Sequence, residues 1–291
     1  MRVLVTGAGG FVGKVVARTL AAAGHQVTAS YRKTRPAELA GLANVALQAL
    51  DLAEMDGLDP LDAVVHCAAD VPAFCPDPDA LYRSNVEGAC RLFDAAVAAG
   101  ATRIVYLSSM SIYGTIFARV VTEDTPSTDP EVYGRSKLEG ERLLAAVCAR
   151  SPGLAGLSIR LPGVVGRGGR NNFLSSTLQR VLKGEPVSAN HASAPFNNIV
   201  HVQDLAGFIA DRLGDLPPGY RVTNIAARDS VPIRDVVARI YATAGREDGS
   251  IWGEAGKAPF TIALDRVVAL GYRPPTVLDS VERFVRDEMA G

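Results

Sequence analysis

A tyrosine and a lysine stand four residues apart in the segment VYGRSKLEGE, as Tyr133 and Lys137. Residues four apart on a helix share one face, so we expect the phenol and the ammonium to be neighbours. A free tyrosine keeps its proton until well above neutral pH, and a nearby positive charge lowers the pKa of a phenol. The pair can therefore act as a general acid and base toward a substrate oxygen.

Two serines end an apolar run in the segment YLSSMSIYG, as Ser108 and Ser109. The run predicts a strand, and open α/β sheets bind their ligands at the carboxyl ends of their strands. A hydroxyl at this position can donate a hydrogen bond to a substrate oxygen. A serine directly after a strand is also a common turn or cap residue, and the sequence leaves both interpretations open.

A glycine-rich segment, TGAGGFVG, follows the first apolar run of the chain. Three of its glycines are spaced three residues apart. Gly7 allows a sharp turn, Gly10 leaves room for a pyrophosphate, and Gly13 lets helix and strand approach closely. A helix that begins here directs its positive end at the phosphates. The segment predicts a dinucleotide cradle formed by Gly7, Gly10, Phe11, Val12 and Gly13.

The residues after the second apolar run favour one dinucleotide over the other. Arg32 and Lys33 stand where NAD-binding proteins usually place a carboxylate for the ribose hydroxyls. Because a basic pair suits a 2′-phosphate, we predict NADP, with NAD as the alternative. Asp51 follows the third run and is a candidate for the adenine edge or for a helix cap.

Short apolar runs alternate with longer helical patterns over the first two thirds of the chain. This alternation predicts an α/β fold with a doubly wound parallel sheet, the Rossmann type. The expected domain covers residues 1–165 with a returning strand near 221–225, and a smaller, loop-rich substrate lobe covers 166–291. The predicted strands are 2–6, 26–31, 45–50, 63–67, 103–108 and 157–161, and the predicted helices are 11–23, 78–99, 131–149, 233–244 and 276–289.

Charge and cysteine content exclude several classes of function. The net charge of −1 gives no long-range attraction to nucleic acid or to an anionic membrane. We expect no signal peptide and no membrane span. The four cysteines and four histidines show no metal-binding spacing, so we expect no metal site and a cytoplasmic protein.

Taken together, these segments resemble the extended short-chain dehydrogenase/reductases, also called the NAD-dependent epimerase/dehydratase family. The matching landmarks appear in the family's order from residue 1 to about 210. They are TGAGGFVG, ALDLAE (49–54), HCAAD (66–70), SNVEG (84–88), SSMSIYG, YGRSK, RLPGVVG (160–166) and NIVHVQDLA (198–206).

The resemblance assigns roles to individual residues. It implies Ser109, Tyr133 and Lys137 as the catalytic triad, and a homodimer formed through the helices at 78–99 and 131–149. It implies that a further set of residues supports or lines the cofactor site: Asp51, Leu52, Ala68, Ala69, Asn85, Lys137 and Pro162. The chain departs from many sugar-nucleotide members at Gly163 and Val165, where those proteins carry asparagine and tyrosine.

Three functions remain compatible with the sequence. The first is an NAD(P)-dependent oxidoreductase or epimerase that moves a hydride to or from a sugar or nucleotide sugar. The second is an NADPH-dependent reductase of a smaller ketone or aldehyde. The third is a dinucleotide-sensing regulator without turnover, which the presence of both Tyr133 and Lys137 disfavours.

Overall fold

The computed structural model describes residues 1–254 and 258–290, and the chain forms two units. The first unit contains residues 1–114, 127–160 and 205–223, and the second contains 115–126, 161–204 and 224–291. The sequence predicted one boundary near residue 165, whereas each of the two units consists of three segments that alternate along the chain. All the side chains discussed below as the candidate site, except Pro162, belong to the first unit.

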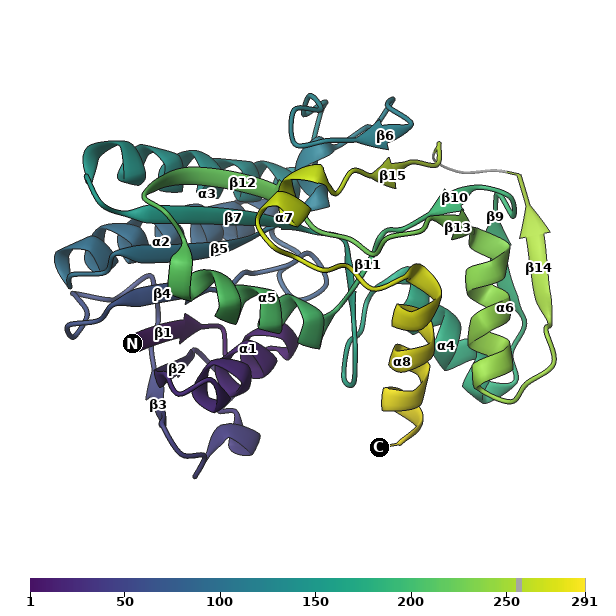
Figure 1. Ribbon diagram of the computed structural model, residues 1–291, viewed down its shortest axis with the longest axis horizontal. Helices are drawn as coiled ribbons and strands as arrows, with labels where there is room; N and C mark the ends of the chain where they lie inside the picture. The colour runs from purple at the N-terminus through teal and green to yellow at the C-terminus, as the bar shows by residue number, and fades with distance from the viewer. Residues whose placement is uncertain (255–257, 291) are drawn as a thin grey trace. The chain divides into compact units, whose positions relative to one another are not determined.

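A seven-stranded sheet forms the centre of the first unit, in the order β12-β7-β5-β4-β1-β2-β3 (Figure 1). The strands from β1 to β5 pair in parallel, and this confirms the predicted α/β class. The bounds are β1 Arg2–Thr6, β2 Gln26–Tyr31, β3 Val45–Ala49, β4 Ala63–His66, β5 Arg103–Ser109, β7 Ala155–Leu161 and β12 Gly219–Asn224.

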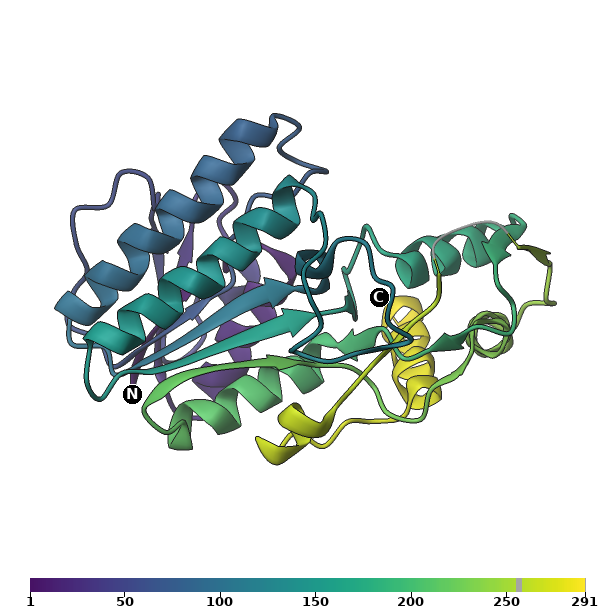
Figure 2. The ribbon, with the colours of Figure 1, turned by 90° about the horizontal axis from the view of Figure 1, so that it is seen from above.

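Helices cover both faces of this sheet. Figure 2 shows α2 (Pro78–Ala98) and α3 (Val132–Arg150) side by side on one face, with α1 (Phe11–Ala22) and α5 (Val202–Asp215) on the other. Because both faces are covered, β4 consists of four buried residues in a row rather than alternating polar and apolar ones. Short 3-10 turns at Ala37–Leu39 and Met110–Tyr113 complete the unit.

The strand order places a ligand crevice at one edge of the sheet. Strand β1 pairs with β2 on one side and with β4 on the other, so successive connections leave it in opposite directions. In doubly wound sheets, this switch point opens a crevice outside the carboxyl ends of the strands. The core beneath it between the sheet and α2 and α3 is apolar, and includes Leu92, Phe93, Ile104, Tyr106 and Leu144.

The second unit is built from short strand pairs and three packed helices. Its apolar core gathers around α4 (Phe173–Lys183), α6 (Ile233–Thr243) and α8 (Val277–Met289). The short helix α7 covers Asp265–Ala269. The strand pairs are β8 (Gly163–Val165) with β11 (Ile199–His201), β6 (Val120–Val121) with β15 (Thr261–Ile262), β9 (Val187–Asn190) with β14 (Ser250–Gly253), and β10 (Pro195–Phe196) with β13 (Val231–Pro232).

No helix in the described part of the chain has both the length and the apolar composition needed to cross a bilayer.

The surroundings of two helical glycines predict that the change from glycine to alanine has opposite effects on stability at the two positions. A Cβ on Gly13 would lie 2.3 Å from the carbonyl oxygen of Gly7, whereas a Cβ on Gly207 in α5 would meet nothing within 4 Å. We expect Gly13→Ala to lower the free energy of unfolding by about 1–3 kcal/mol, because α1 must move away from the loop. Gly207→Ala should raise it by about 0.5–1 kcal/mol, because alanine restricts the unfolded chain. Urea unfolding of both variants measures the two signs, and a neutral Gly13→Ala would contradict the packing described.

Candidate active site

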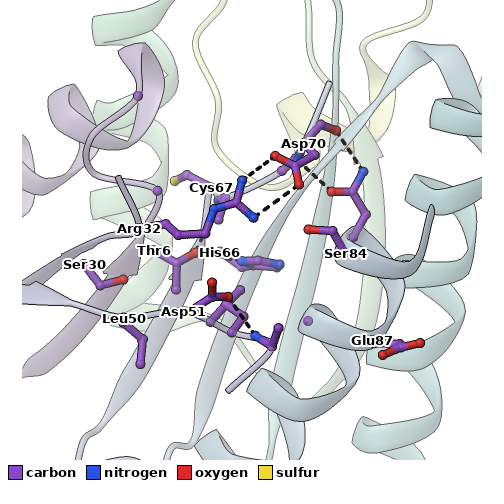
Figure 3. A pocket seen from close by; sticks show the side chains of 18 of the residues that line it. Thr6, Ser30, Arg32, Leu50, Asp51, His66, Cys67, Asp70, Ser84 and Glu87 are labelled. Atoms are coloured by element: carbon purple, nitrogen blue, oxygen red, sulfur yellow. Dashed lines mark hydrogen bonds and ion pairs between the residues drawn. The ribbon is translucent and has the colours of Figure 1, made fainter. Parts of the chain in front are cut away.

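A groove of about 580 Å³ opens over the carboxyl ends of β1, β2, β3 and β4 (Figure 3). This is the size of a pocket that holds a small molecule or a cofactor. Four stretches of chain contribute most of its wall: the glycine loop, the end of β2, residues 50–53 after β3, and residues 66–70 at the end of β4. Helix α2 closes one side with residues that include Ser84, Asn85 and Glu87.

The glycine loop is held in a shape that only glycine adopts without strain. Gly7 has a φ of +71°, and a Cβ on it would lie 2.7 Å from the amide nitrogen of Ala68. The amide of Gly10 donates to the carbonyl of Gly7 at 2.9 Å, and Gly10 is the N-cap of α1. Backbone and helix N-terminus thus border the groove with few side chains between them, as a pyrophosphate requires. The groove therefore fits a dinucleotide.

Hydrogen bonds between β1 and β4 form the floor of the groove. Nδ1 of His66 lies 2.7 Å from Oγ1 of Thr6, which also accepts from the amide of Ala68 at 3.3 Å. Burial, assisted by the charge of Lys137, lowers the pKa of His66 to about 3. His66 is therefore neutral at physiological pH, and it serves as a structural link rather than as an acid.

An ion pair joins the ends of β2 and β4 at the groove. Nη2 of Arg32 donates to Oδ1 of Asp70 at 2.7 Å, and Nη1 donates to Oδ2 at 3.3 Å (Figure 3). Partial burial raises the pKa of Asp70, but hydrogen bonds from Arg32 and Ser84 outweigh it and leave that pKa below its ordinary value. Asp70 is therefore a carboxylate at neutral pH.

Ser109, Tyr133 and Lys137 come together where β5 ends and α3 begins. Ser109 lies close enough to Tyr133 to favour its anion, and its Oγ donates to Oγ of Ser111 at 3.1 Å. The buried ammonium of Lys137 donates to the carbonyl of Leu107 at 2.8 Å, and it lies 5.9 Å from the ring centroid of Tyr133. The spacing of four residues thus brings phenol and ammonium to one face of α3, as expected.

The pKa of Tyr133 shifts in the direction opposite to the one expected. Burial raises it to about 12, and the hydrogen bond from Ser109 offsets only part of this effect. Burial also lowers the pKa of Lys137 to about 8, while Cys67 and Glu141 act in the other direction. In the protein by itself, burial therefore sets the direction of the shift of Tyr133, because it penalises the phenolate anion.

A buried ion pair lies one turn beyond Lys137. Oε2 of Glu141 accepts from Nη2 of Arg160 on β7 at 2.7 Å, and the two side chains are only 5% and 9% exposed. Ser108 donates to Oε1 of Glu141 at 2.5 Å, and Arg160 donates to the hydroxyl of Tyr113 at 2.8 Å. Burial lowers the pKa of Arg160, but hydrogen bonds and charge attraction from Glu141 raise it above its ordinary value. The network ties α3 to β5 and β7.

The residues expected at the site fall into three groups. The candidate catalytic cluster consists of Ser109, Tyr133 and Lys137, which are not among the residues that line the groove. Phe11, Val12 and Gly13 form the first turn of α1, Lys33 lies in the loop after β2, and Pro162 follows β7 in the second unit. The residues that line the groove are Gly7, Gly10, Arg32, Asp51, Leu52, Ala68, Ala69 and Asn85.

Sequence reasoning missed Asp70 in the groove and Glu141 and Arg160 beneath the catalytic cluster. A usable signal existed for Asp70, because it directly follows the end of an apolar strand, where ligand-binding side chains gather. Glu141 stands four residues after Lys137 on the same helix face. Nothing in the sequence paired these acids with their arginine partners.

The sequence of this chain is similar to a known protein family and to individual enzymes. The profile of the NAD dependent epimerase/dehydratase family matches residues 3–226. The dTDP-4-dehydro-6-deoxy-D-allose reductase of a Streptomyces species is 30% identical over 84% of this chain and 82% of its own length. The D-erythronate dehydrogenase of Cupriavidus necator is 28% identical over 99% of this chain and 98% of its own.

A solved structure extends the likeness to nearly the whole fold. MoeE5 in complex with UDP-glucose and NAD is 27% identical, with a TM-score of 0.82 over 98% of both chains. The sheet order and the matched residues confirm the resemblance seen in the sequence.

The buried ion pair predicts a large loss of stability when its carboxylate is neutralised. Glu141→Gln keeps the shape of the side chain but leaves the guanidinium of Arg160 buried without a counter-charge. We expect a loss of about 3 kcal/mol in the free energy of unfolding, measured with urea. Glu139→Gln is the matched control, because its pair with Arg142 is exposed and should change stability by less than about 0.5 kcal/mol. Equal effects of the two substitutions would contradict the role assigned to Glu141.

The lowered pKa of Lys137 predicts that stability rises with pH above about 8. Between that pH and the pKa of an unfolded lysine, only the unfolded chain keeps the proton, so raising the pH favours the folded state by up to about 3 kcal/mol. We expect the stability of the wild type relative to Lys137→Met, from urea unfolding, to increase from pH 8 to pH 10. The exposed control Lys183→Met should show no such trend, and a flat difference for Lys137→Met would contradict the shift.

Proposed function

Because the chain belongs to the NAD-dependent epimerase/dehydratase family, we propose that it is an NAD(P)-dependent oxidoreductase or epimerase. The substrate is a sugar or a nucleotide sugar. Hydride moves between the nicotinamide and the substrate carbon that carries a hydroxyl or carbonyl oxygen. The observation that carries the proposal is the placement of Tyr133 and Lys137 on one face of α3, with the ammonium 5.9 Å from the centre of the tyrosine ring, in the same unit as the glycine-lined groove.

Tyr133 is the proposed acid and base. Its phenolate takes the proton of a substrate hydroxyl when hydride leaves the carbon that carries that hydroxyl, and in the reverse direction the phenol gives the proton to the carbonyl oxygen and becomes a phenolate. Ser109 Oγ, which lies near Tyr133 at the end of β5, orients that oxygen. A bound dinucleotide supplies the hydride acceptor or donor, and its oxidised ring adds a positive charge. The buried ammonium of Lys137 stabilises the phenolate that forms.

We propose NADP as the preferred dinucleotide, with NAD as the alternative. Arg32 lines the groove at the end of β2, and the exposed Lys33 follows it. A guanidinium and an ammonium at this position suit the 2′-phosphate that distinguishes NADP. Asp51 and Leu52 follow β3 in the groove wall, which supports their proposed contact with the adenine. MoeE5 was solved with NAD, so the choice is open to experiment.

The relatives support two candidate classes of substrate. The reductase of a dTDP sugar and MoeE5 with its UDP-glucose support a nucleotide sugar. The D-erythronate dehydrogenase matches this chain over nearly the full length of both proteins, which favours a smaller hydroxy or keto compound as the second candidate. Gly163 and Val165 fit that candidate, since they lack the polar side-chain groups of the asparagine and tyrosine that many sugar-nucleotide members carry there.

We further propose a homodimer in the cytoplasm. Helices α2 and α3 lie side by side on one face of the sheet, which supports their use as a shared dimer surface (Figure 2). All four cysteines are unpaired thiols, as is usual in a reducing compartment.

Removal of the hydroxyl oxygen of Tyr133 tests its proposed role as the acid and base. We expect Tyr133→Phe to lower turnover at least about 100-fold, because the acid and base is lost, while the dissociation constant of the dinucleotide changes less than about twofold. Turnover is followed by nicotinamide absorbance and by chromatography of the products, with a panel of UDP sugars, dTDP sugars and small hydroxy acids, because an epimerase changes its substrate without a net change in nicotinamide. Calorimetry measures binding.

Tyr82→Phe on α2 is the matched control and should keep wild-type turnover. A Tyr133→Phe variant that retains its turnover would contradict the mechanism. The panel itself separates the two substrate candidates, because only the true class supports turnover by the wild type.

A further inference from the structure

We propose that Asp70 is a specificity-determining residue: its carboxylate competes with the 2′-phosphate of NADP for the guanidinium of Arg32. This inference rests on the proposed role of Arg32 as the phosphate ligand. It adds a second residue, 38 positions away in the sequence, whose effect on dinucleotide choice has the opposite sign.

The guanidinium is already engaged in the protein alone. Both terminal nitrogens of Arg32 point at the two carboxylate oxygens of Asp70, a forked arrangement at 2.7 and 3.3 Å (Figure 3). A phosphate prefers the same planar fork, because two parallel N–H donors match two of its oxygens. A 2′-phosphate that uses this fork must displace the carboxylate.

Asp70 is held in place from its backbone and does not need Arg32 to position it. The side-chain amide of Asn85 accepts from the backbone N–H of Asp70 at 2.7 Å and donates to its carbonyl at 2.9 Å. Asn85 also donates to Ser136 on α3 at 3.1 Å. The hydroxyl of Ser84 is a second partner of the carboxylate. Asp70 therefore stays at the groove when Arg32 turns away.

The charge of the groove acts in the same direction. Its described lining carries two guanidinium groups, Arg32 and Arg83, and three carboxylates, Asp51, Asp70 and Glu87, for a net charge of −1. The carboxylate of Asp70 is 19% exposed, whereas the side chain of Arg32 is 42% exposed, so the acid is the less screened member of the pair. An added phosphate dianion meets repulsion from Asp70 unless Arg32 lies between them. NAD carries no 2′-phosphate and leaves the ion pair intact.

Neutralising Asp70 tests the competition directly. Calorimetry gives the dissociation constants of NADP⁺ and NAD⁺ for the full-length wild type and for Asp70→Asn, at one ionic strength. The asparagine keeps the shape of the side chain, and the backbone bonds to Asn85 do not depend on its charge. We expect NADP⁺ to bind about fivefold more tightly to the variant, as expected for releasing a partly exposed ion pair, with NAD⁺ nearly unchanged.

Two further variants assign the effect to the pair. Arg32→Ala should weaken NADP⁺ binding much more than NAD⁺ binding, and in the double variant Asp70→Asn should bring at most a small gain. Asp62→Asn is the matched control for the change in charge, because Asp62 pairs with Arg2 at the opposite end of β4. It should leave both dissociation constants unchanged.

The outcomes separate this inference from the proposed NADP preference. A wild type that binds NAD⁺ more tightly overturns the preference, yet a fivefold shift toward NADP⁺ in Asp70→Asn still supports the competition. Unchanged or weaker NADP⁺ binding by Asp70→Asn overturns the inference, since it would mean that Asp70 is neutral toward Arg32 or orients it for the phosphate. An equal gain with and without Arg32 would overturn it too, because the effect would be general repulsion.

Discussion

The buried ion pair between Glu141 and Arg160 holds together the part of the first unit that carries the proposed catalytic residues. It connects α3 to β7, and through Ser108 it also connects α3 to β5. Charges that are almost completely removed from water are tolerated only when their hydrogen-bonding groups are paired, so the geometry of this network is restricted. Ser109 follows Ser108, and Tyr133 and Lys137 precede Glu141 on its helix. The position of the proposed triad therefore depends on a contact outside it.

Close backbone approach is the corresponding constraint in the groove. Gly7 needs its positive φ and its contact with the end of β4, and Gly13 lets α1 begin directly beside the loop. Where side chains are absent, backbone amides and a helix N-terminus are left to meet an anion. Side chains line other parts of the groove, and among them Arg32 and Asp70 form an ion pair.

The two halves of the proposed site have different electrostatic character. The groove is partly exposed and carries ion pairs that solvent screens, so single charges there tune binding. The catalytic cluster is buried, and its tyrosine and lysine both have pKa values shifted toward the neutral form. A positive charge delivered by a bound oxidised dinucleotide would act strongly in such a place, because little water screens it. The proposed acid–base role of Tyr133 is therefore expected to depend on the bound cofactor.

The fold class, the family, the glycine turn and the shared helix face of Tyr133 and Lys137 could all be predicted from the amino-acid sequence. These features are local: a strand, a turn and a helix follow one another within a few residues, and a spacing of four on one helix face brings two side chains together. The contacts of Arg32 with Asp70 and of Glu141 with Arg160 were visible only in the folded chain, because they join residues 38 and 19 positions apart. Strand order brings the first two together, and the packing of α3 on the sheet brings the second two together. The tertiary structure also decided the direction of the pKa shift of Tyr133, since burial depends on every element packed around the phenol.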